Sequence, residues 1–597
     1  MKVRILPNGI AATYQQMYAW MLRHESFHLG MLAVVIGVLA GYGALAVRMG
    51  IEAISEWWVH APTWSAAIHL TPWYIYILAP VCGGLMVGLI NKYILPANEA
   101  KVIPGVIESL SERGGYLSPR KSIGELASNM ISVGSGASMG REAPTVALGA
   151  ALASHVSSLL ELDEKQMRTM VGCGVAAGIA SSFNAPIAGV MFALEVILVD
   201  YAVTTFTPIV LASVIGTVIS RSYFGNMPAF TIPDFRLVSS WEVLIYVVLG
   251  VFCGLISAAI IRAMPIARRQ FALYVPNPLL RPATAGLILG FCALFIPEIM
   301  SIGYGTLDAV LTEQPNVHLW GLSTPLVLFL AVLFLAKAVT STVCMAGGFG
   351  GGMIGPSLFI GVTAGGFFGI IVHALFPAIT ETYGAYALVA SGAMMAAMLQ
   401  APISSILMVF ELSGNYEIMM PLMAACVIAA LTKRAFGAQS VLTEPLEEKG
   451  LEPNWGLERS WMRAVPISRI PRRKIPAVAA NASLALLKKA YVDSGKGCVQ
   501  VIDAKGRMLG IVTFVDLQHW LLDATLDQIV VAAEVANRHV ISVSEDDSLL
   551  DAIRILDRES FEQMPVMSAT KEGEMLGILS RNAVFSTYHK LIVKHGE

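Results

Sequence analysis

The amino-acid sequence predicts an all-α polytopic membrane protein, built from an inverted repeat of broken helices and followed by a pair of small α/β domains. The first observation is composition: the 597 residues are 55% hydrophobic and 14% charged, values that are atypical of a soluble protein. The second is the distribution of charge, because 36 of the 82 charged residues lie in the last 147 positions. The third is an internal repeat within the apolar part of the chain.

Three long runs in the apolar part contain no Asp, Glu, Lys or Arg, namely residues 171–194, 338–380 and 382–410. Each is long enough to cross a hydrocarbon layer of about 30 Å, which takes about 20 helical residues. Each is also interrupted by Gly or Pro with polar neighbours. Lipid cannot satisfy the backbone groups that such breaks expose, so breaks are tolerated where protein or a polar cavity surrounds them. The runs therefore predict broken helices along a transport path.

The repeat consists of two pairs of matching segments. Residues 171–195 match residues 387–411 at an offset of 216, since both contain Ala-Pro-Ile and end in Glu. Residues 140–149 match residues 352–361 at an offset of 212, through Gly-x-x-x-Pro and a second Gly five residues later. Two ordered matches at nearly one offset indicate a duplicated multi-helix unit. In transporters such halves are often inverted, with the substrate between them.

In both repeats a glycine-rich loop leads through Pro into an apolar run, which is typical of a helix start. A helix start exposes unpaired N–H donors and the positive end of the helix dipole, about half an elementary charge, and so favours an anion. Gly140, Gly352 and Gly355 allow the backbone to approach such an ion. The alternative is that these glycines only permit close helix packing.

Glu142 favours the anion site over the packing alternative. It follows Arg141 within an otherwise uncharged stretch, and a carboxylate at membrane depth is costly and by default functional. At a helix start it could occupy the anion site itself and leave when protonated or displaced, which is a gate. The alternatives are an ion pair with Arg141 or a helix cap.

These motifs resemble the CLC chloride channels and transporters along nearly the whole chain. The segment GREAP at residues 140–144 resembles GREGP, GMIGP at 352–356 resembles GxFxP, and AKVIP at 100–104 resembles GSGIP. The segments FNAPIAGVMFALEV and FELSGNY also match. The resemblance implies a homodimer with a pore in each subunit and Glu142 as the gating glutamate. It places along the anion pathway Lys101, Gly140, Arg141, Gly352, Met353, Ile354, Gly355 and Leu442.

Besides the substitutions within these motifs, the sequence departs from the family pattern at three places that bear on transport. Lys101 stands at the position of the central-site Ser, and Leu442 stands at the position of the pore-lining Tyr. Lys101 could bind the anion, or its side chain could extend to the cytoplasmic interface without meeting the ion. Val196 stands where family exchangers usually have a Glu that carries protons. This favours passive conduction by a channel over proton-coupled exchange.

The charged tail is predicted to contain two rounds of the order β-α-β-β-α, of about 60 residues each. The first round begins with an expected strand at residues 465–470. They resemble a tandem CBS domain pair. In that family an adenosine ribose is held by an Asp or Asn that stands three residues after a Ser or Thr. Thr513 and Asp516 have this spacing in the first round. The second round has Ser580 but Ala583. One adenosine nucleotide site is therefore expected, and the alternative is that the tail only dimerises and steadies the membrane part.

The expected domains follow from these boundaries: a cytoplasmic N-terminal segment at 1–29, a CLC-type transmembrane domain at 30–445, a linker at 446–462, and CBS domains at 463–525 and 526–597. The N-terminus and the CBS domains are expected on the cytoplasmic side of the cell membrane.

The expected function is transport of chloride or a similar monovalent anion by a homodimer in the lipid bilayer, with no enzyme activity and no required cofactor. A net charge of −2 argues against a nucleic-acid partner. The alternatives are a proton-coupled chloride antiporter and, from another class, a membrane-embedded nucleotide sensor that acts through its CBS pair.

Overall fold

The chain folds into two compact units, Met1–Asn454 and Trp455–Glu597, each described by itself. Apart from a few isolated positions, the computed structural model describes residues 25–68, 70–95, 102–225, 241–315, 322–380, 382–437, 439–448, 465–495, 497–520, 525–559, 561–571 and 573–595. Lys101, most of the expected N-terminal segment and most of the expected linker lie outside these residues.

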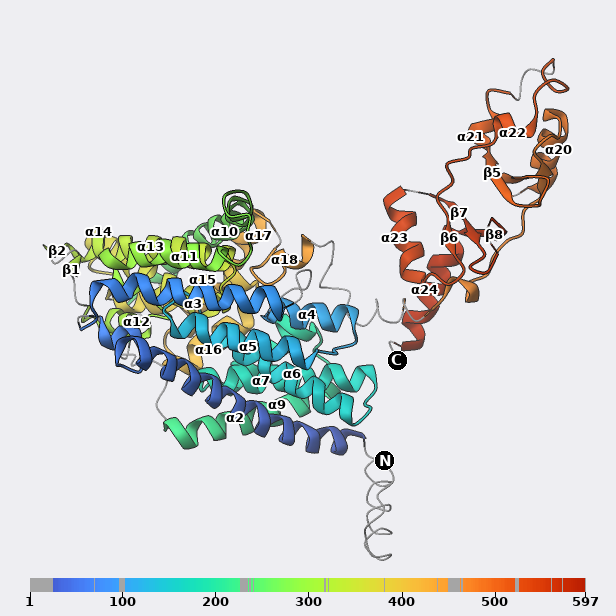
Figure 1. Cartoon of the computed structure of the whole chain (residues 1–597). Helices are drawn as coiled ribbons and strands as arrows, with labels where there is room; N and C mark the ends of the chain where they lie inside the picture. The colour runs from blue at the N-terminus through green and yellow to red at the C-terminus, as the bar shows by residue number, and fades with distance from the viewer. Residues whose placement is uncertain are drawn as a thin grey trace, which may run out of the picture. The chain divides into compact units, whose positions relative to one another are not determined.

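The first unit is helical (Figure 1). Its helices are α2 (Glu25–Val59), α3 (Trp73–Tyr93), α4 (Val102–Glu112), α5 (Pro119–Gly134), α6 (Glu142–Leu159), α7 (Glu164–Phe183), α8 (Pro186–Phe192), α9 (Val203–Phe224), α10 (Glu242–Tyr274), α11 (Arg281–Phe295), α12 (Tyr304–Leu311), α13 (Leu326–Gly347), α14 (Ile354–Leu375), α15 (Tyr383–Leu399), α16 (Pro402–Ser413), α17 (Met419–Ala435) and α18 (Glu444–Glu447). A two-stranded hairpin, β1 (His318–Leu319) and β2 (Leu322–Ser323), precedes α13. Among the described residues, six helices are long and apolar enough to cross a membrane.

The expected helix breaks are present in both repeats. Asn184 follows the last residue of α7 and Gln400 follows the last residue of α15, and both have the left-handed conformation, with φ of 59° and 56°. Each is followed by Ala-Pro and a new helix, α8 or α16. Proline cannot donate a backbone hydrogen bond and disfavours the helical conformation in the residue before it. The repeated sequence therefore produces a repeated break, as predicted.

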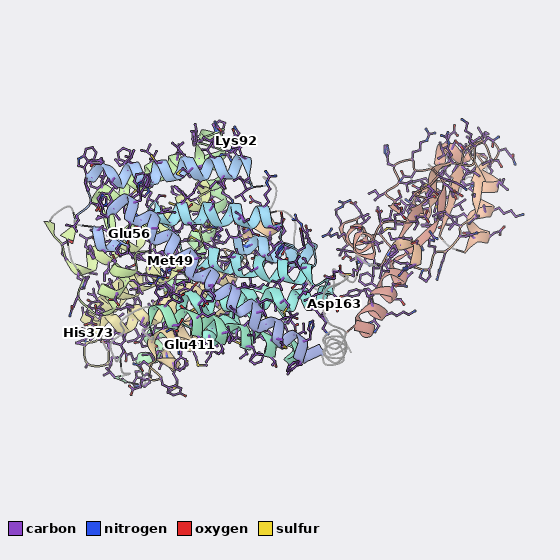
Figure 2. All side chains as sticks on the ribbon, turned by 60° about the horizontal axis from the view of Figure 1, so that its bottom comes forward. Met49, Glu56, Lys92, Asp163, His373 and Glu411 are labelled. Carbon is purple, nitrogen blue, oxygen red and sulfur yellow. The ribbon has the colours of Figure 1, made fainter. Side chains whose placement is uncertain are left out.

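Helix packing uses glycine at equivalent places in the two repeats. Helix α6 packs along α7, and α14 packs along α15. A Cβ atom at Gly149 of α6 would collide with the backbone of Gly174, and a Cβ at Gly361 of α14 would lie 2.6 Å from the carbonyl oxygen of Ala390. Small residues allow membrane helices to approach this closely. Figure 2 shows the side chains that project from the helices of this unit, with Met49, Glu56 and Glu411 among those labelled.

The second unit contains two three-stranded sheets with the same topology. The first has the order β3 (Ala477–Ala479), β4 (Cys498–Ile502), β5 (Met508–Thr513), and the second has the order β6 (Val543–Ser544), β7 (Gln563–Met567), β8 (Met575–Ser580). In each, the first pair is parallel and the second antiparallel. The helices are α20 (Leu484–Ser494), α21 (Phe514–Leu517), α22 (Ala532–Val535), α23 (Leu549–Glu559) and α24 (Arg581–His595). The two predicted α/β rounds are confirmed.

One expected strand is wrong. Residues 465–470 form a 3-10 turn, Ile467–Arg469, instead of a strand. Pro466 and Pro471 flank this turn, and proline offers no N–H to a strand ladder. The N–H groups of Ile467 and Ser468 instead donate to the carbonyls of Asp547 and Glu545 at 2.8 and 3.0 Å.

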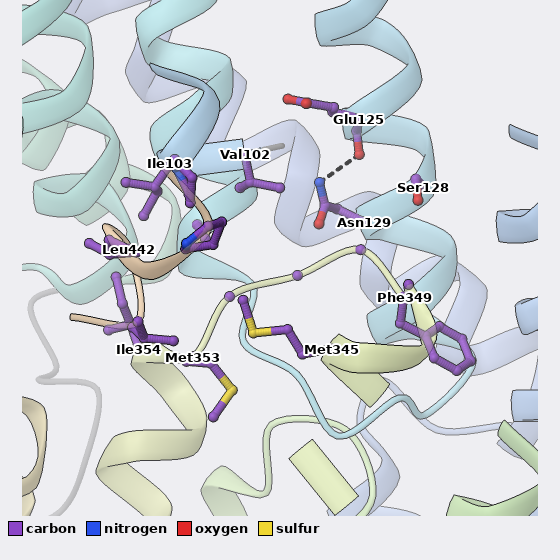
Figure 3. Close-up of a pocket in the computed structure, with 18 of the residues that line it drawn as sticks. Val102, Ile103, Glu125, Ser128, Asn129, Met345, Phe349, Met353, Ile354 and Leu442 are labelled. Atoms are coloured by element: carbon purple, nitrogen blue, oxygen red, sulfur yellow. Dashed lines mark hydrogen bonds between the residues drawn. The ribbon is translucent and has the colours of Figure 1, made fainter. Parts of the chain in front are cut away.

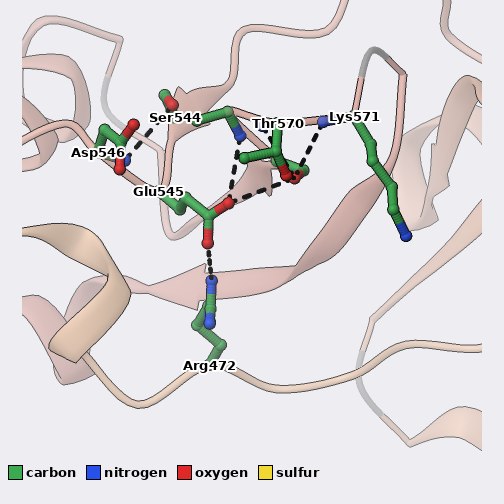
Figure 4. Close-up of polar contacts among 8 residues, drawn as sticks. Arg472, Ser544, Glu545, Asp546, Thr570 and Lys571 are labelled. Carbon is green, nitrogen blue, oxygen red and sulfur yellow. Dashed lines mark hydrogen bonds and ion pairs between the residues drawn. The ribbon is translucent and has the colours of Figure 1, made fainter.

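Glu545 connects separate segments of the second unit (Figure 4). Its Oε1 accepts hydrogen bonds from the Ser568 hydroxyl at 3.3 Å and the Ala569 N–H at 3.2 Å. Its Oε2 lies 3.8 Å from Nη1 of Arg472, which precedes β3. The segment that leads into the first sheet is thereby joined to the β7–β8 turn of the second.

Candidate functional site

The glycine loops of the two repeats are paired directly. The Gly140 N–H donates to the Gly352 carbonyl at 2.8 Å, and the Gly352 N–H donates to the Gly140 carbonyl at 3.1 Å. A Cβ atom at Gly140 would lie 2.9 Å from the Gly355 nitrogen. Helices α6 and α14, one from each repeat, therefore start next to each other. The structure brings together the three glycines that sequence analysis selected.

Glu142 is the first residue of α6, and its side chain is fully buried. Its Oε1 accepts a hydrogen bond from the Tyr304 hydroxyl of α12. Its Oε2 lies beside Gly140 and Gly355, 3.1 Å from where a Cβ of Gly355 would stand. Within the described part of the chain, this oxygen has no hydrogen-bond partner. The carboxylate thus lies between the two helix starts, where backbone N–H groups and helix dipoles favour a negative charge.

The geometry favours neither simple alternative for Glu142. No ion pair joins Arg141 to Glu142 among the described residues; the Arg141 guanidinium instead lies 5.2 Å from the centre of the Tyr304 ring. The hydrogen bond that the carboxylate accepts comes from a different helix, so it does not cap its own.

A cavity of about 310 Å³ lies next to the paired loops (Figure 3). Its wall is formed by the start of α4, by α5, by the α13–α14 loop and by the segment before α18. Among the residues selected from the sequence, Gly352, Met353, Ile354 and Leu442 line it. Glu142 is not among the lining residues, but its neighbour Ala143 is.

Two of the motif departures have a structural context. Ala143 replaces the second Gly of GREGP, and its Cβ occupies the space that a Cβ at Gly352 would need. The larger residue fits because its neighbour is a glycine. Val102, at the second Gly of GSGIP, has φ of 58°, a conformation that favours glycine. It begins α4 and lines the cavity.

Several polar residues of the cavity were missed by sequence analysis. Asn129 of α5 donates its side-chain amide to the Glu125 carbonyl at 2.6 Å, and both residues line the cavity. Arg268 of α10, also at the wall, forms ion pairs with Glu444 and, at 3.1 Å, with Glu448. The signal in the sequence was Glu125, because a carboxylate within a membrane segment is by default functional.

Val196 lies in a π-helical turn, Ala193–Leu198, partly buried against the hydrophobic core. The preceding residue, Glu195, accepts the N–H groups of Ile403 at 3.1 Å and Ser404 at 2.7 Å at the start of α16. In the same way Glu411 accepts the N–H groups that begin α8. The Glu that ends each repeated segment was the signal for this exchange between the repeats.

In the second unit Thr513 and Asp516 lie together at the end of β5. One carboxylate oxygen of Asp516 accepts the Thr513 N–H at 2.8 Å and the Thr513 hydroxyl at 2.7 Å. Both residues line a cavity of about 710 Å³ to which the two α/β rounds contribute.

The repeated broken helices, the paired helix starts and the buried carboxylate between them define a class of membrane transport protein. Comparison with known families agrees: residues 83–434 match the family described as voltage gated chloride channel, and residues 467–523 and 531–590 match the CBS domain. The chain belongs to the CLC family of anion transport proteins and carries two C-terminal CBS domains. The predicted fold class is confirmed.

Individual relatives cover most of the chain. A putative chloride channel protein ClcB-like of Ralstonia nicotianae is 35% identical over 70% of this chain and 96% of its own length. The H(+)/Cl(-) exchange transporter ClcA of Vibrio campbellii is 26% identical over 70% of this chain and 89% of its own. The crystal structure of a eukaryotic CLC transporter, 20% identical, has a TM-score of 0.60 and covers 93% of this chain and 98% of that one.

Proposed function

We propose that this protein conducts chloride or a similar monovalent anion passively across the membrane, and that Glu142 is its gate. The observation that carries the proposal is the position of the Glu142 carboxylate, fully buried between the starts of α6 and α14. An anion and a carboxylate favour the same N–H donors and the same helix dipoles. The anion and the carboxylate therefore compete for the same binding site between the two helix starts.

Anion movement follows from this competition. When Glu142 is protonated or swings away, the N–H groups at the starts of α6 and α14 become available to the ion. The cavity lined by Ile354 and Leu442 adjoins these helix starts. Arg141 and the undescribed Lys101 would add positive charge to this pathway. Neutral backbone donors suit conduction, because an ion must bind weakly enough to leave.

Val196 supports passive movement. Its side chain is apolar and packs against the hydrophobic core, so it offers no proton to carry at the position where family exchangers have a Glu. The second candidate is proton-coupled exchange, which the 26% identical relative named H(+)/Cl(-) exchange transporter supports.

The surrounding organisation belongs to the same proposal. We propose a homodimer in the cell membrane, with the domain boundaries expected from the sequence and with the N-terminus and the CBS domains on the cytoplasmic side. An adenosine nucleotide is proposed to bind in the cavity beside Thr513 and Asp516. The nucleotide would then modulate transport; it is not required for it.

The test is flux from liposomes that contain the purified protein, followed with chloride and pH electrodes at the same time. Passive conduction predicts chloride release without stoichiometric proton movement. Uphill proton pumping driven by a chloride gradient would establish the exchanger instead. Empty liposomes and liposomes with heat-inactivated protein set the background.

A further inference from the structure

The side chain that contacts Glu142 comes from a part of the chain outside the recognised motifs. Tyr304 begins α12, and its hydroxyl donates a hydrogen bond to Glu142 Oε1. The charged group of Arg141 lies over the same ring, 5.2 Å from its centre. The tyrosine is thus held on its face by Arg141 and directed at the carboxylate through its hydroxyl.

The loop before Tyr304 is fixed in place by a buried lysine. Lys337 of α13 is 0% exposed, and its Nζ donates to the carbonyl of Ile299 at 2.9 Å and to that of Ser301 at 2.6 Å. The same Nζ lies 4.8 Å from the centre of the Phe359 ring. A buried ammonium is costly unless it is satisfied in this way. Lys337 therefore fixes the backbone of this loop through two of its carbonyl groups.

The loop has further fixed points close to the site. The Ser301 N–H donates to the Gly136 carbonyl at 2.9 Å, and the Ser301 hydroxyl donates to the Val133 carbonyl at 3.2 Å. Gly303 has φ of 82°, and a Cβ there would lie 2.6 Å from the Phe359 ring of α14. The backbone on the N-terminal side of Tyr304 is consequently confined against α5, α13 and α14.

We propose that Tyr304 is the positioning residue that holds the Glu142 carboxylate in the anion site, and that Lys337 supports Tyr304 through the loop carbonyls. The inference rests on the proposed gate. A hydroxyl donated to an ionised carboxylate stabilises the occupied state, so the hydrogen bond must break before the carboxylate leaves. Tyr304 thereby sets the fraction of time during which Glu142 excludes the anion.

The experiment is chloride flux of Tyr304→Phe in liposomes. The variant keeps the ring beneath Arg141 and removes the hydroxyl alone. A hydrogen bond to a charged group corresponds to a shift of roughly tenfold or more in the equilibrium between held and released carboxylate. We expect chloride flux to rise by up to about tenfold. Tyr304→Leu lacks the same hydroxyl and serves if the Phe variant does not reconstitute.

Tyr386→Phe is the matched control. The Tyr386 hydroxyl donates to Glu242 Oε1 at 2.8 Å, and both residues are buried in the same helical unit. The control loses an equivalent tyrosine–glutamate hydrogen bond. We expect its flux to equal that of the wild type.

A cycle with Glu142→Ala separates this inference from the gate. If Tyr304 acts through Glu142, then Tyr304→Phe changes nothing in a Glu142→Ala background. A rise in flux of equal size in both backgrounds, or no rise when Glu142 is present, overturns the role of Tyr304. Failure of the gate itself is recognised separately, because Glu142→Ala alone would then conduct like the wild type.

Discussion

In the proposed function, a single buried carboxylate, Glu142, controls access of the anion to the site. Burial of a charged group costs several kcal/mol unless hydrogen bonds and dipoles replace water. At Glu142 the compensation consists of one hydroxyl, from Tyr304, and the starts of α6 and α14. A hydrogen bond to a charged group contributes about 1.5–3 kcal/mol. The proposed gate requires that the carboxylate be held weakly enough for protonation or an anion to displace it.

The first prediction concerns that carboxylate. Glu142→Gln should make chloride flux faster and less dependent on pH, because a neutral amide does not compete with an anion for the helix starts. Chloride flux from liposomes between about pH 4.5 and 7.5 measures both the rate and its dependence on pH. Glu242→Gln is the control, since Glu242 is also fully buried and also accepts a tyrosine hydroxyl. Unchanged pH dependence in the Glu142 variant would contradict the gate.

The second prediction concerns Lys101, which precedes the cavity-lining residue Val102. At an effective dielectric constant near 20, an ammonium about 4 Å from a unit anion contributes about 4 kcal/mol. Lys101→Ser should therefore weaken chloride affinity and raise maximal flux, measured as a function of chloride concentration. Lys92→Ser, at the exposed end of α3, should change neither. Wild-type values for both quantities in Lys101→Ser would place the ammonium outside the pathway.

At the scale of the elements, each of the short helices α8 and α16 is capped by a residue of the other repeat. Each starts after Ala-Pro, and each has its first free N–H groups bound by a glutamate from the other repeat. The two helices are in contact. At membrane depth an unsatisfied N–H costs several kcal/mol. The glutamates thus connect the two halves of the duplicated fold.

The third prediction follows from this exchange. Glu195→Ala and Glu411→Ala should each destabilise the protein by about 2–3 kcal/mol, because each exposes two backbone donors that a charged group had satisfied. The measurement is the temperature at which the monodisperse peak in detergent falls by half. Glu417→Ala, an exposed position, should leave that temperature unchanged. If the first two variants matched this control, the caps would contribute nothing to stability.

For the whole molecule, the proposed anion site and the proposed nucleotide site lie in different compact units. The helical unit contains the paired loops and their cavity, whereas the CBS unit contains the cavity beside Thr513 and Asp516. Each proposed site can therefore be tested by substitutions within its own unit.

The fourth prediction tests the CBS cavity in the full-length protein. Asp516→Ala should abolish binding of a labelled adenosine nucleotide, because the carboxylate would hold the ribose. It also removes a helix cap, which costs about 1 kcal/mol. Asp551→Ala controls for the cap, since Asp551 accepts the Ser548 N–H at 3.1 Å and hydroxyl at 2.6 Å at the start of α23. Binding that survives in Asp516→Ala would move the site elsewhere.

The features that the sequence predicted are those encoded by neighbouring residues. Composition identified the membrane helices, the Ala-Pro steps located the helix breaks, and the repeated Gly-x-x-x-Pro motif located the starts of α6 and α14. The strand expected at residues 465–470 was wrong, because Pro466 within it and Pro471 directly after it outweighed its apolar pattern.

What the sequence by itself determined about this protein is its class: a duplicated, broken-helix membrane unit with an anion-favouring loop in each repeat, joined to two CBS domains. Only the tertiary structure decided which groups meet. Tyr304 reaches Glu142 across 162 residues of chain, and Lys337 fixes a loop 36 and 38 residues before it. Proline, glycine and apolar runs act on the backbone within a few residues. Contacts between distant side chains depend instead on how whole helices pack, which no local pattern specifies.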